Sequence, residues 1–313
     1  MGNNGTIGKV RDTIAQVFIG KPETIRTLLT GFVSGLHVLI EDVPGVGKTT
    51  LARSLAAAVG MDFTRIQFTP DLLPGDITGM TIWDQEKKDF VYKQGAIMHQ
   101  FVLADEINRA SPRTQSSLLE AMQDGSVSID GRTYRLPDPF FVVATQNPSD
   151  FIGAFHLPEG ELDRFGVALS IGYPLSNDER SILNRFQSEE PLSHVKPIMS
   201  PTEVTETRAQ VRKVQISDAV RGFIIQIANK TRASRFIRLG ASPRASLHMQ
   251  IAAQGHAYID GRAFVIPEDV MAVTIPVLGH RIILSAEARM ENKSAASVIA
   301  QILKECEIPT GIR

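Results

Sequence analysis

Residues 37–50, HVLIEDVPGVGKTT, join an apolar run to a glycine-rich turn that ends in Gly-Lys-Thr. The run at 38–40 is typical of a buried strand, and the residues that follow the turn, LARSLAAAVG, are strong helix formers. A strand, a glycine-rich turn and a helix in this order form the setting that a phosphate-binding loop needs. These residues therefore predict a polyphosphate site at the end of the first core strand.

The predicted loop brings backbone N–H groups and the positive end of a helix close to the phosphates. Lys48 is expected to reach the outer phosphates, and the hydroxyl of Thr49 is expected to bind Mg²⁺. One position departs from the pattern, because Asp42 stands where the pattern has its first glycine. The residues predicted to contact the nucleotide are Pro44, Gly45, Val46, Gly47, Lys48, Thr49 and Thr50.

The composition is that of an ordinary globular protein. The chain has 313 residues, 43% of them hydrophobic and 21% charged, with a formal net charge of −1. This balance argues against a generally basic nucleic-acid surface. Cys306 is the only cysteine, which excludes an internal disulfide and a thiolate metal cluster, so we expect a reducing, cytoplasmic compartment. No apolar run approaches the ~20 residues of a membrane span, and residues 1–6 fit an N-myristoylation pattern only loosely.

Strands and helices alternate after two N-terminal helices. This alternation predicts an α/β fold with a mainly parallel sheet, whose strands end at a common ligand-binding edge. Residues 69–76 contain too many helix breakers to predict a helix. Beyond the first strand, we expect strands at 63–68, 101–104, 140–145 and 167–171, and hairpins at 77–92 and 127–134. A solvated loop is the alternative for the first hairpin.

A linker at 191–197 separates this α/β part from a region in which the pattern predicts helices only. We therefore expect a core domain at 1–192, with hairpins inserted near 76–95 and 126–136, and an α-helical domain at 198–313. The helices are expected at 201–212, 217–233, 243–260, 267–284 and 294–305.

Two further strand ends carry side chains that suit phosphoryl transfer. The strand at 101–104 is followed by Asp105 and Glu106; we expect Asp105 to hold Mg²⁺ and Glu106 to orient and deprotonate the attacking water. Asn147, after the strand at 140–145, could position that water, although an Asx turn before proline is the alternative. Because parallel strands end at one edge of a sheet, these residues are expected to meet the phosphate loop.

Two arginines are candidates for stabilising the transferred phosphoryl group. Arg164 could complete the site of a neighbouring chain, or it could pair locally with Asp163 or Glu161. Arg244 opens a predicted helix of the C-terminal region, from which it could reach the γ-phosphate and couple the nucleotide state to the domain angle. A cation in the first turn opposes the helix dipole, which favours an anionic partner for Arg244.

The remaining polar residues have simpler interpretations. The seven histidines form no metal-ligand pattern, and His248 and His256 are interpreted as structural. Arg232, Arg235 and Arg238 could touch phosphates, but a solvated interdomain face is favoured because no nucleic-acid motif accompanies them. Trp83, in the first predicted hairpin, is either a packing anchor or an exposed contact.

The chain resembles the MoxR family of AAA+ ATPases, in the clade with an insert in the second helix. The segments that carry the resemblance are VPGVGKTTLARSLA, LADEINRASPRTQSSLLEAMQDG, ATQNP, LPEGELDRF, GASPRAS, VLGHRIILS and VIAQILKECEIP, in this order. The resemblance implies a P-loop NTPase core of five parallel strands in the order 5-1-4-3-2, an α-helical lid, and ATP with Mg²⁺ between core and lid. It also implies that Arg164 is an arginine finger, Asn147 sensor 1 and Arg244 sensor 2. Because many relatives tolerate a residue other than glycine at this position, we expect Asp42→Gly to change nucleotide affinity by less than about tenfold, ~1.4 kcal/mol.

The resemblance further implies an ATP-hydrolysing chaperone that remodels or activates other proteins. Family members form homo-oligomeric rings, usually hexamers, and their partners often contain a von Willebrand factor A domain, in some cases for metal loading. A nucleic-acid-associated motor is the alternative, which the near-neutral charge disfavours. A nucleotide-gated scaffold with little turnover is a third interpretation, and the Asp105-Glu106 pair argues against it.

Overall fold

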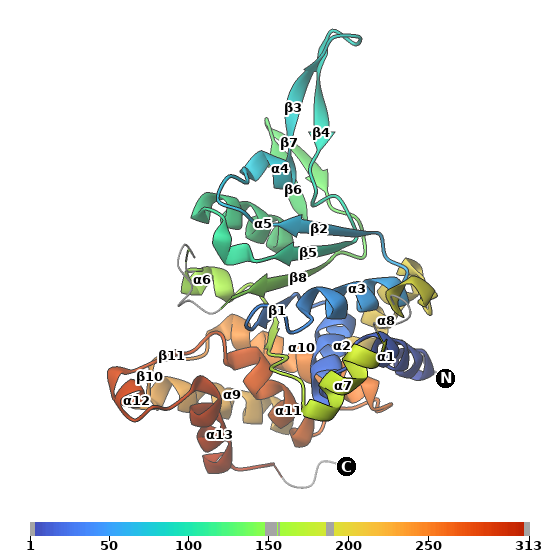
Figure 1. Ribbon diagram of the computed structural model, residues 1–313. Coiled ribbons are helices and arrows are strands. Elements are labelled where there is room, and N and C mark those ends of the chain that lie inside the picture. Colours follow the sequence, from blue (N-terminus) through green and yellow to red (C-terminus); the bar gives the residue numbers. More distant parts are fainter. Residues whose placement is uncertain (1–3, 148–154, 156, 186–190, 310–313) are drawn as a thin grey trace.

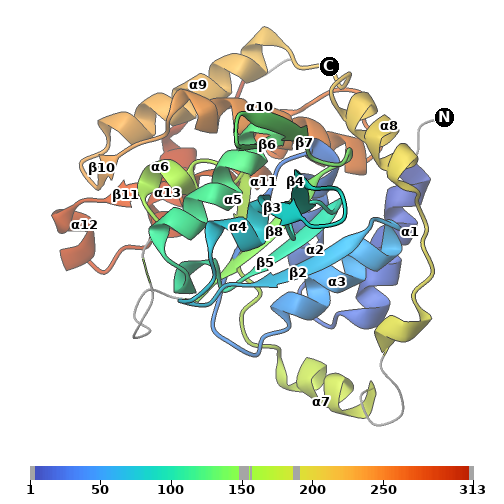
Figure 2. The same cartoon turned by 90° about the horizontal axis from the view of Figure 1, so that it is seen from above.

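A central sheet with helices packed on both faces forms the upper part of the molecule in Figure 1, and a helical C-terminal region lies beside it. Figure 2 shows the same layers from above. The computed structural model describes residues 4–147, 155, 157–185 and 191–309. The first three positions of the N-terminal lipidation pattern lie outside them. No helix within these ranges is long and apolar enough to cross a membrane.

Five strands form the central sheet: β1 (Val38–Glu41), β2 (Phe63–Gln67), β5 (Phe101–Asp105), β8 (Phe141–Gln146) and β9 (Val167–Leu169). All neighbouring strands run parallel, in the order β2-β5-β8-β1-β9. Counted along the chain, these are core strands 2, 3, 4, 1 and 5, so the order read from β9 is 5-1-4-3-2, as expected. The parallel register gathers the carboxyl ends of the strands at one edge, where the sequence places the candidate site.

Alternate side chains of the strands point to opposite faces of the sheet, which gives two apolar cores. Val38 and Ile40 face one core, and Leu39 between them faces the other. In the first core the rings of Phe101 and Phe141 meet edge to face, with centroids 5.3 Å apart. The helices of the first core include α1 (Asn4–Val17), α2 (Pro22–Ser34) and α3 (Lys48–Ala58); α5 (Pro112–Asp124) covers the second.

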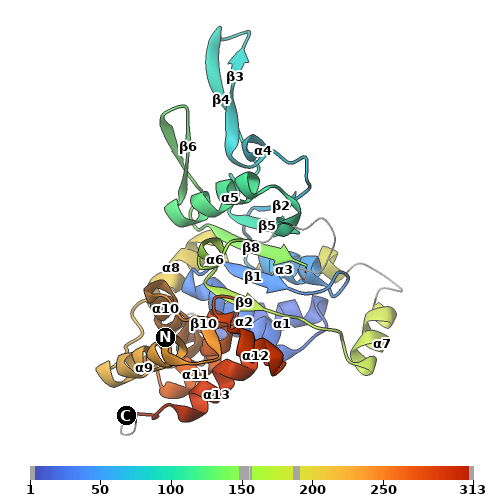
Figure 3. The same cartoon turned by 90° about the vertical axis from the view of Figure 1, so that its left-hand side faces the viewer.

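Two hairpins project from the same end of the molecule (Figure 3). Their strands are β3 (Gly79–Asp84) with β4 (Asp89–Gln94), and β6 (Ser126–Ile129) with β7 (Arg132–Arg135). The first confirms the predicted hairpin over the alternative of a loop. The second turns at Asp130 and Gly131, which both have positive φ angles. The rings of Tyr92 and Tyr134 stack with centroids 3.9 Å apart and join the two hairpins.

The prediction that residues 69–76 contain no helix is wrong, because α4 (Pro74–Thr78) begins within them. Proline breaks a helix interior but suits the first turn, where its missing N–H has no helical partner to lose. The carboxylate of Asp76 accepts a hydrogen bond of 2.9 Å from the N–H of Leu73 and caps this turn. Short helices that the pattern did not predict include α6 (Glu159–Leu162) and α7 (Ser176–Arg185).

The C-terminal region is mostly helical, with α10 packed against α2 and α11 against β9. Its helices are α8 (Pro201–Val211), α9 (Asp218–Ala233), α10 (Pro243–Ile259), α11 (Pro267–Leu278), α12 (Ala286–Met290) and α13 (Ala295–Glu305). The expectation of helices only is wrong, because β10 (Ile237–Leu239) pairs with β11 (Ile283–Leu284). The helix predicted at 267–284 also ends early, since His280 and Arg281 leave the helix to donate hydrogen bonds to backbone carbonyls of the α/β part.

Candidate active site

The phosphate loop lies between the end of β1 and the start of α3. Gly45 and Gly47 have positive φ angles of 86° and 93°, a left-handed conformation that favours glycine. Gly47 is the N-cap of α3, and no described side chain caps this helix end. The first N–H groups of α3 are therefore available to an anion, which is the arrangement that a phosphate-binding loop requires.

Lys48 is held inside the loop. Its Nζ donates to the backbone carbonyl of Asp42 at 2.6 Å and to Oδ1 of Asn147 at 2.8 Å, and the residue is only 8% exposed. Burial lowers the pKa of Lys48, while the charges of Asp105, Asp42 and Glu106 oppose this shift. The ammonium group thus lies at the edge of the sheet where the predicted acidic residues meet.

The carboxylate of Asp42, at the entry to the loop, binds the segment that follows β9. Its Oδ2 accepts hydrogen bonds from the hydroxyl of Ser170 at 2.9 Å and from the N–H groups of Ile171 and Gly172, both at 2.7 Å. Its Oδ1 accepts one from the N–H of Val43 at 2.9 Å. Burial alone would raise the pKa of Asp42, but these hydrogen bonds outweigh it and lower the pKa. Asp42 therefore anchors one segment to another, a role that the sequence did not reveal.

Asp105 and Glu106 follow one another at the end of β5 and are fixed by different partners. Oδ1 of Asp105 accepts a hydrogen bond from the hydroxyl of Thr145 at 2.6 Å, and its Oδ2 accepts two from Arg65 at 2.6 and 2.9 Å. Thr145 in turn accepts one from the N–H of Glu106 at 2.8 Å. Glu106 has a φ of 56°, a left-handed conformation that costs about 1–3 kcal/mol in a residue other than glycine. The strained turn separates the two carboxylates.

Asn147 links Lys48 to Glu106. Its Oδ1 accepts from Lys48, and its Nδ2 donates to Oε1 of Glu106 at 3.2 Å. The other carboxylate oxygen of Glu106 accepts hydrogen bonds from Gln67 at 3.2 Å and Arg109 at 3.1 Å. The structure thus brings the predicted basic, acidic and amide side chains to one edge of the sheet.

Four polar residues around the carboxylates were not predicted: Arg65, Gln67, Arg109 and Thr145. A signal existed for two of them, because Arg65 and Gln67 alternate on the predicted second strand and so share one face. In the parallel register Gln67 lies beside Asp105. Arg109 follows a strained turn, and no sequence pattern predicts that its side chain points toward Glu106.

A cavity of about 240 Å³ lies beside the phosphate loop. Its walls come from the segment after α1, the segment after β9, and α7, with apolar contributions from Phe18, Ile171 and Ile182. Apolar walls next to a phosphate loop suit the base of a bound nucleotide. Among the described residues, the C-terminal helices contribute nothing to this lining, which differs from the expected place of ATP between core and lid.

Arg164 and Arg244 lie at the opposite edge of the sheet. Together with His37, which directly precedes β1, they line a second cavity of about 210 Å³. The N–H of Gly166 donates to the carbonyl of His37 at 2.9 Å, so this segment meets the amino end of β1. The phosphate loop follows the carboxyl end of the same strand. The structure therefore does not bring the two arginines to the phosphate loop of their own chain.

The two arginines are incompletely paired in this chain. Nε of Arg164 lies 3.2 Å from Oε2 of Glu161, the local pair that the sequence left open, but its Nη1 is buried with no hydrogen-bond partner among the described residues. Nε of Arg244 lies 3.9 Å from Oδ2 of Asp163. A buried guanidinium N–H without a partner is unfavourable, so the second cavity suits an anion.

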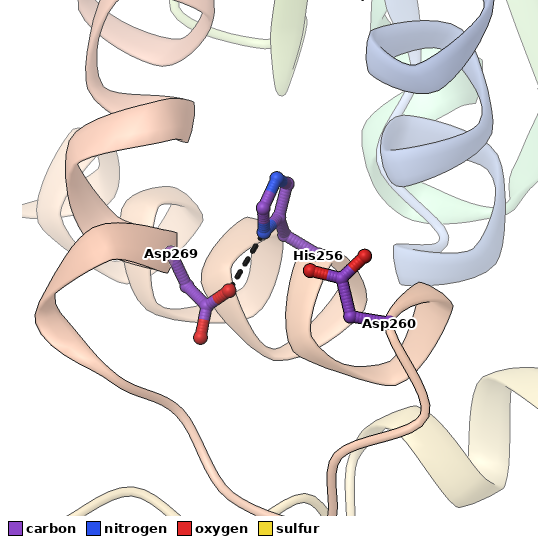
Figure 4. Close-up of side chains that lie close together, drawn as sticks. All are labelled: His256, Asp260 and Asp269. Carbon is purple, nitrogen blue, oxygen red and sulfur yellow. Dashed lines mark hydrogen bonds and ion pairs between the residues drawn. The ribbon is translucent and has the colours of Figure 1, made fainter.

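His256, Asp260 and Asp269 meet in the C-terminal region, a cluster with the elements of a metal site that the sequence did not predict (Figure 4). Arg26 donates to Nε2 of His256 at 3.0 Å, so Nδ1–H of His256 donates to Asp269 at 2.7 Å. Arg262 donates to both oxygens of Asp269, and Arg26 also donates to Asp260 at 2.7 Å. Because two guanidinium groups occupy the candidate ligand atoms, we interpret the cluster as a bridge from α2 to α10 and α11. This agrees with a structural role for His256.

The three arginines that the sequence offered as phosphate contacts have partners within the chain. Arg232 donates to a backbone carbonyl at 2.9 Å, Arg235 lies 3.4 Å from Glu287, and Arg238 lies 3.9 Å from Glu159. These pairs favour the solvated face over a phosphate-binding surface.

A parallel sheet of order 5-1-4-3-2, a phosphate loop after its first strand and an Asp-Glu pair after its third define a P-loop ATPase of the AAA+ class. Comparison with known families agrees. Residues 37–167 match the ATPase family associated with various cellular activities (AAA), and residues 229–302 match the AAA lid domain.

Individual relatives identify the family within this class. The uncharacterized protein YeaC of Bacillus subtilis is 43% identical over 97% of this chain and 95% of its own length. The chaperone MoxR1 of Mycobacterium tuberculosis is 38% identical over 95% of this chain and 80% of its own length. A crystal structure of a candidate ATPase from Cytophaga hutchinsonii superposes with a TM-score of 0.90 and 37% identity, over 98% of this chain and 96% of its own. The chain belongs to the MoxR family of AAA+ ATPases.

Proposed function

We propose that this ATPase works as a ring-forming chaperone in which each active site is completed by two chains. The observation that carries the proposal is the position of Arg164 and Arg244 at the edge of the sheet opposite the phosphate loop. Each chain thus offers a nucleotide site at one edge and two incompletely paired arginines at the other. A closed ring, a hexamer in our expectation, would set the arginines of one chain against the nucleotide of the next.

The residues around the loop fit ATP and Mg²⁺. The N-terminus of α3 and Lys48 suit the phosphates, and the apolar cavity beside them suits the base. Thr49 and Asp105 supply oxygen donors, the ligands that Mg²⁺ prefers. When bound, Mg²⁺ would neutralise charge on the outer phosphates.

In the proposed mechanism, phosphate oxygens compete with Asn147 for the ammonium group of Lys48. The amide of Asn147 then becomes available to align the attacking water, and Glu106, already in contact with this amide, orients and deprotonates that water. Arg164 of the adjacent chain would stabilise the charge on the transferred phosphoryl group, and Arg244 would sense the γ-phosphate.

The role of Glu106 is tested with Glu106→Gln. The variant should bind ATP but release phosphate about 10²–10⁴-fold more slowly, since it lacks the general base. Glu120→Gln, an exposed position on α5, is the matched control and should keep wild-type turnover. Unchanged turnover in Glu106→Gln would contradict the assignment.

Sharing of the site is tested by mixing variants. Arg164→Ala and Glu106→Gln should each be slow alone, and their mixture should recover activity, because Glu106→Gln chains supply the missing arginine to intact Glu106 sites. If no mixing ratio restores activity, Arg164 serves only in the ion pair with Glu161 of its own chain.

For the client, we propose a protein, with a von Willebrand factor A-domain partner and metal loading as the finer expectation. The name of MoxR1 supports the chaperone assignment, and the exposed rings of Trp83 and Phe90 offer an apolar contact. A purified A-domain protein should bind the Glu106→Gln variant in the presence of ATP and dissociate with ADP.

ATPase stimulation by DNA that falls as salt rises would instead favour the nucleic-acid motor. A cytoplasmic location also stays a prediction.

A further inference from the structure

Arg281, just after α11, is buried deep between the C-terminal region and the sheet. Its side chain is 3% exposed, and its Nε donates to Oδ1 of Asp163 at 2.9 Å. One Nη2 hydrogen bond, of 3.2 Å, reaches the carbonyl of Asp163, and another reaches that of Phe165. Nη1 donates to the carbonyl of Gly166 at 3.1 Å. The guanidinium group therefore binds the backbone on both sides of Arg164.

Other residues of the C-terminal region hold the same short segment. Nε2 of His280 donates to the carbonyl of Phe165 at 3.1 Å, and the hydroxyl of Ser242 lies 3.1 Å from both carboxylate oxygens of Asp163. Ser242 caps the helix on which Arg244 is the second residue. The backbone that carries Arg164 and the helix start that carries Arg244 are thus joined through Asp163.

Burying the charged guanidinium group of Arg281 carries a desolvation cost. Burial lowers the pKa of Arg281 to about 10 even though the charge of Asp163 opposes the shift. Buried ion pairs stabilise a fold little compared with apolar residues of similar volume, so stability alone does not account for this contact. The planar guanidinium meets several acceptors in fixed directions, which a lysine ammonium does not do.

We propose that Arg281 is a positioning residue for Arg164: it fixes the segment 163–166 to the C-terminal region, so that Arg164 and Arg244 reach the neighbouring chain as one rigid unit. The inference rests on the proposed function, in which Arg164 acts in the adjacent site. Movement of the C-terminal region would then move Arg164 toward or away from the nucleotide site of the adjacent chain. The position of the C-terminal region in one chain would thereby control ATP hydrolysis in the next.

Arg281→Lys tests the proposal, with Arg208→Lys as the matched control. Arg208 is a half-buried arginine that also donates from the C-terminal region to backbone carbonyls, those of Phe32 and Phe140, but it makes no hydrogen bond to the segment 163–166. Arg281→Lys should bind a fluorescent ATP analogue like the wild type and lose at least about tenfold in turnover, part of the 10³–10⁵-fold contribution of an arginine finger. Arg208→Lys should lose less than about threefold.

Mixing experiments then locate the defect. Arg281→Lys mixed with Lys48→Ala should recover activity, because Lys48→Ala chains keep a well-placed Arg164. Arg281→Lys mixed with Arg164→Ala should stay as slow as the two variants alone, because neither chain offers a positioned arginine although both retain a phosphate loop. A defect in folding or in the chain's own nucleotide site would not give this pair of results.

Three outcomes would overturn the inference: wild-type turnover of Arg281→Lys, rescue by Arg164→Ala, or loss of nucleotide binding by both Arg281→Lys and Asp163→Asn, which would make the contact a requirement of the fold as a whole. If only Arg281→Lys fails to bind nucleotide, Asp163→Asn takes its place in the mixtures with the same expectations. The proposed function fails separately, if Arg164→Ala mixed with Lys48→Ala shows no rescue.

Discussion

Asp42 departs from the phosphate-loop pattern, and its contacts show what the aspartate does there. Its carboxylate holds Ser170, Ile171 and Gly172, and the last two line the cavity that suits the base. A glycine at this position would keep the loop but leave that wall without an anchor. The residue thus connects the phosphate part of the site to the base part.

We expect Asp42→Gly to weaken ATP binding by more than about tenfold, because hydrogen bonds to a charged group contribute about 1.5–3 kcal/mol each. This replaces the smaller change that the family resemblance implied. Inorganic tripolyphosphate should lose much less affinity, since it does not use the base cavity. Competition titrations against a fluorescent nucleotide measure both constants, with Ser170→Ala, which removes a single donor, as a milder control. Equal losses for ATP and tripolyphosphate would contradict this role.

His37, a half-buried residue that lines the second cavity, makes stability depend on pH. Burial, assisted by the charge of Arg208, lowers its pKa to about 4, although its hydrogen bond to the Met122 carbonyl opposes the shift. Between about pH 4 and pH 6.5, His37 therefore binds a proton in the unfolded chain, where its pKa is about 6.5, but not in the folded chain. This contribution to stability is complete above about pH 6.5 and is lost as the pH falls toward about 4.

We expect His37→Gln to flatten the pH dependence of unfolding. Between about pH 5 and pH 6, one such histidine adds about 1 kcal/mol per pH unit to the slope of the unfolding free energy. Urea titrations of both proteins at several pH values measure this slope. An identical slope in the variant and the wild type would show that the folded chain accepts the proton at His37.

The candidate site could be predicted at residue level wherever a side chain belongs to a strand end. Lys48, Asp105 and Asn147 follow three strands of one parallel sheet, so their meeting follows from topology alone. The pair of Arg164 with Glu161 was one alternative that the sequence left open, but the position of Arg164 beside Arg244, at the opposite edge of the sheet, could not be predicted in this way. Its surroundings depend on how the C-terminal region packs, which contacts between distant residues decide and no local pattern records.

At the scale of elements, the first hairpin is held at its base and exposed at its tip. Tyr92 stacks on Tyr134 near the sheet, whereas Trp83 and Phe90 are 53% and 61% exposed and meet mainly each other, with ring centroids 5.1 Å apart. Of the two interpretations of Trp83, the exposed contact fits this environment better.

We expect the double substitution Trp83→Ala/Phe90→Ala to reduce the unfolding free energy by no more than about 1.5 kcal/mol, the upper end for an aromatic pair. Phe101→Ala, which removes a fully buried ring of β5, should reduce it by about 3–5 kcal/mol. Urea unfolding followed by circular dichroism compares the two variants. A double variant as unstable as Phe101→Ala would show that the tip belongs to the core.

Elements with a strong period or a clear turn were predicted, and those set by long-range contacts were not. The Asp-Gly turn and the apolar strands carry their own signals. The pairing of β10 with β11 joins residues far apart in sequence, and the early end of α11 reflects hydrogen bonds from His280 and Arg281 to the sheet. Neither feature can be predicted from local sequence propensity, because both depend on contacts between distant residues.

At the scale of the molecule, several contacts bind the C-terminal region to the α/β part at different points. Arg281 donates hydrogen bonds to the segment before β9, and Arg26 of α2 donates hydrogen bonds to His256 and Asp260 of the C-terminal region. In this structure the phosphate loop and the two arginines lie at opposite edges of the sheet of one chain. In the proposed function, the complete site therefore forms between chains.

Turnover should consequently depend on protein concentration. We expect the ATPase rate per chain to fall steeply on dilution below the assembly constant, because each dissociated chain keeps its nucleotide site but loses the neighbour's Arg164, a contribution of about 10³–10⁵-fold in rate. Binding of a fluorescent ATP analogue per chain should change far less over the same range. Arg164→Ala should be slow at every concentration, and mass photometry of the same samples reports the oligomer. A constant rate per chain where only monomers are present would show that one chain suffices, and the two arginines would then need another role.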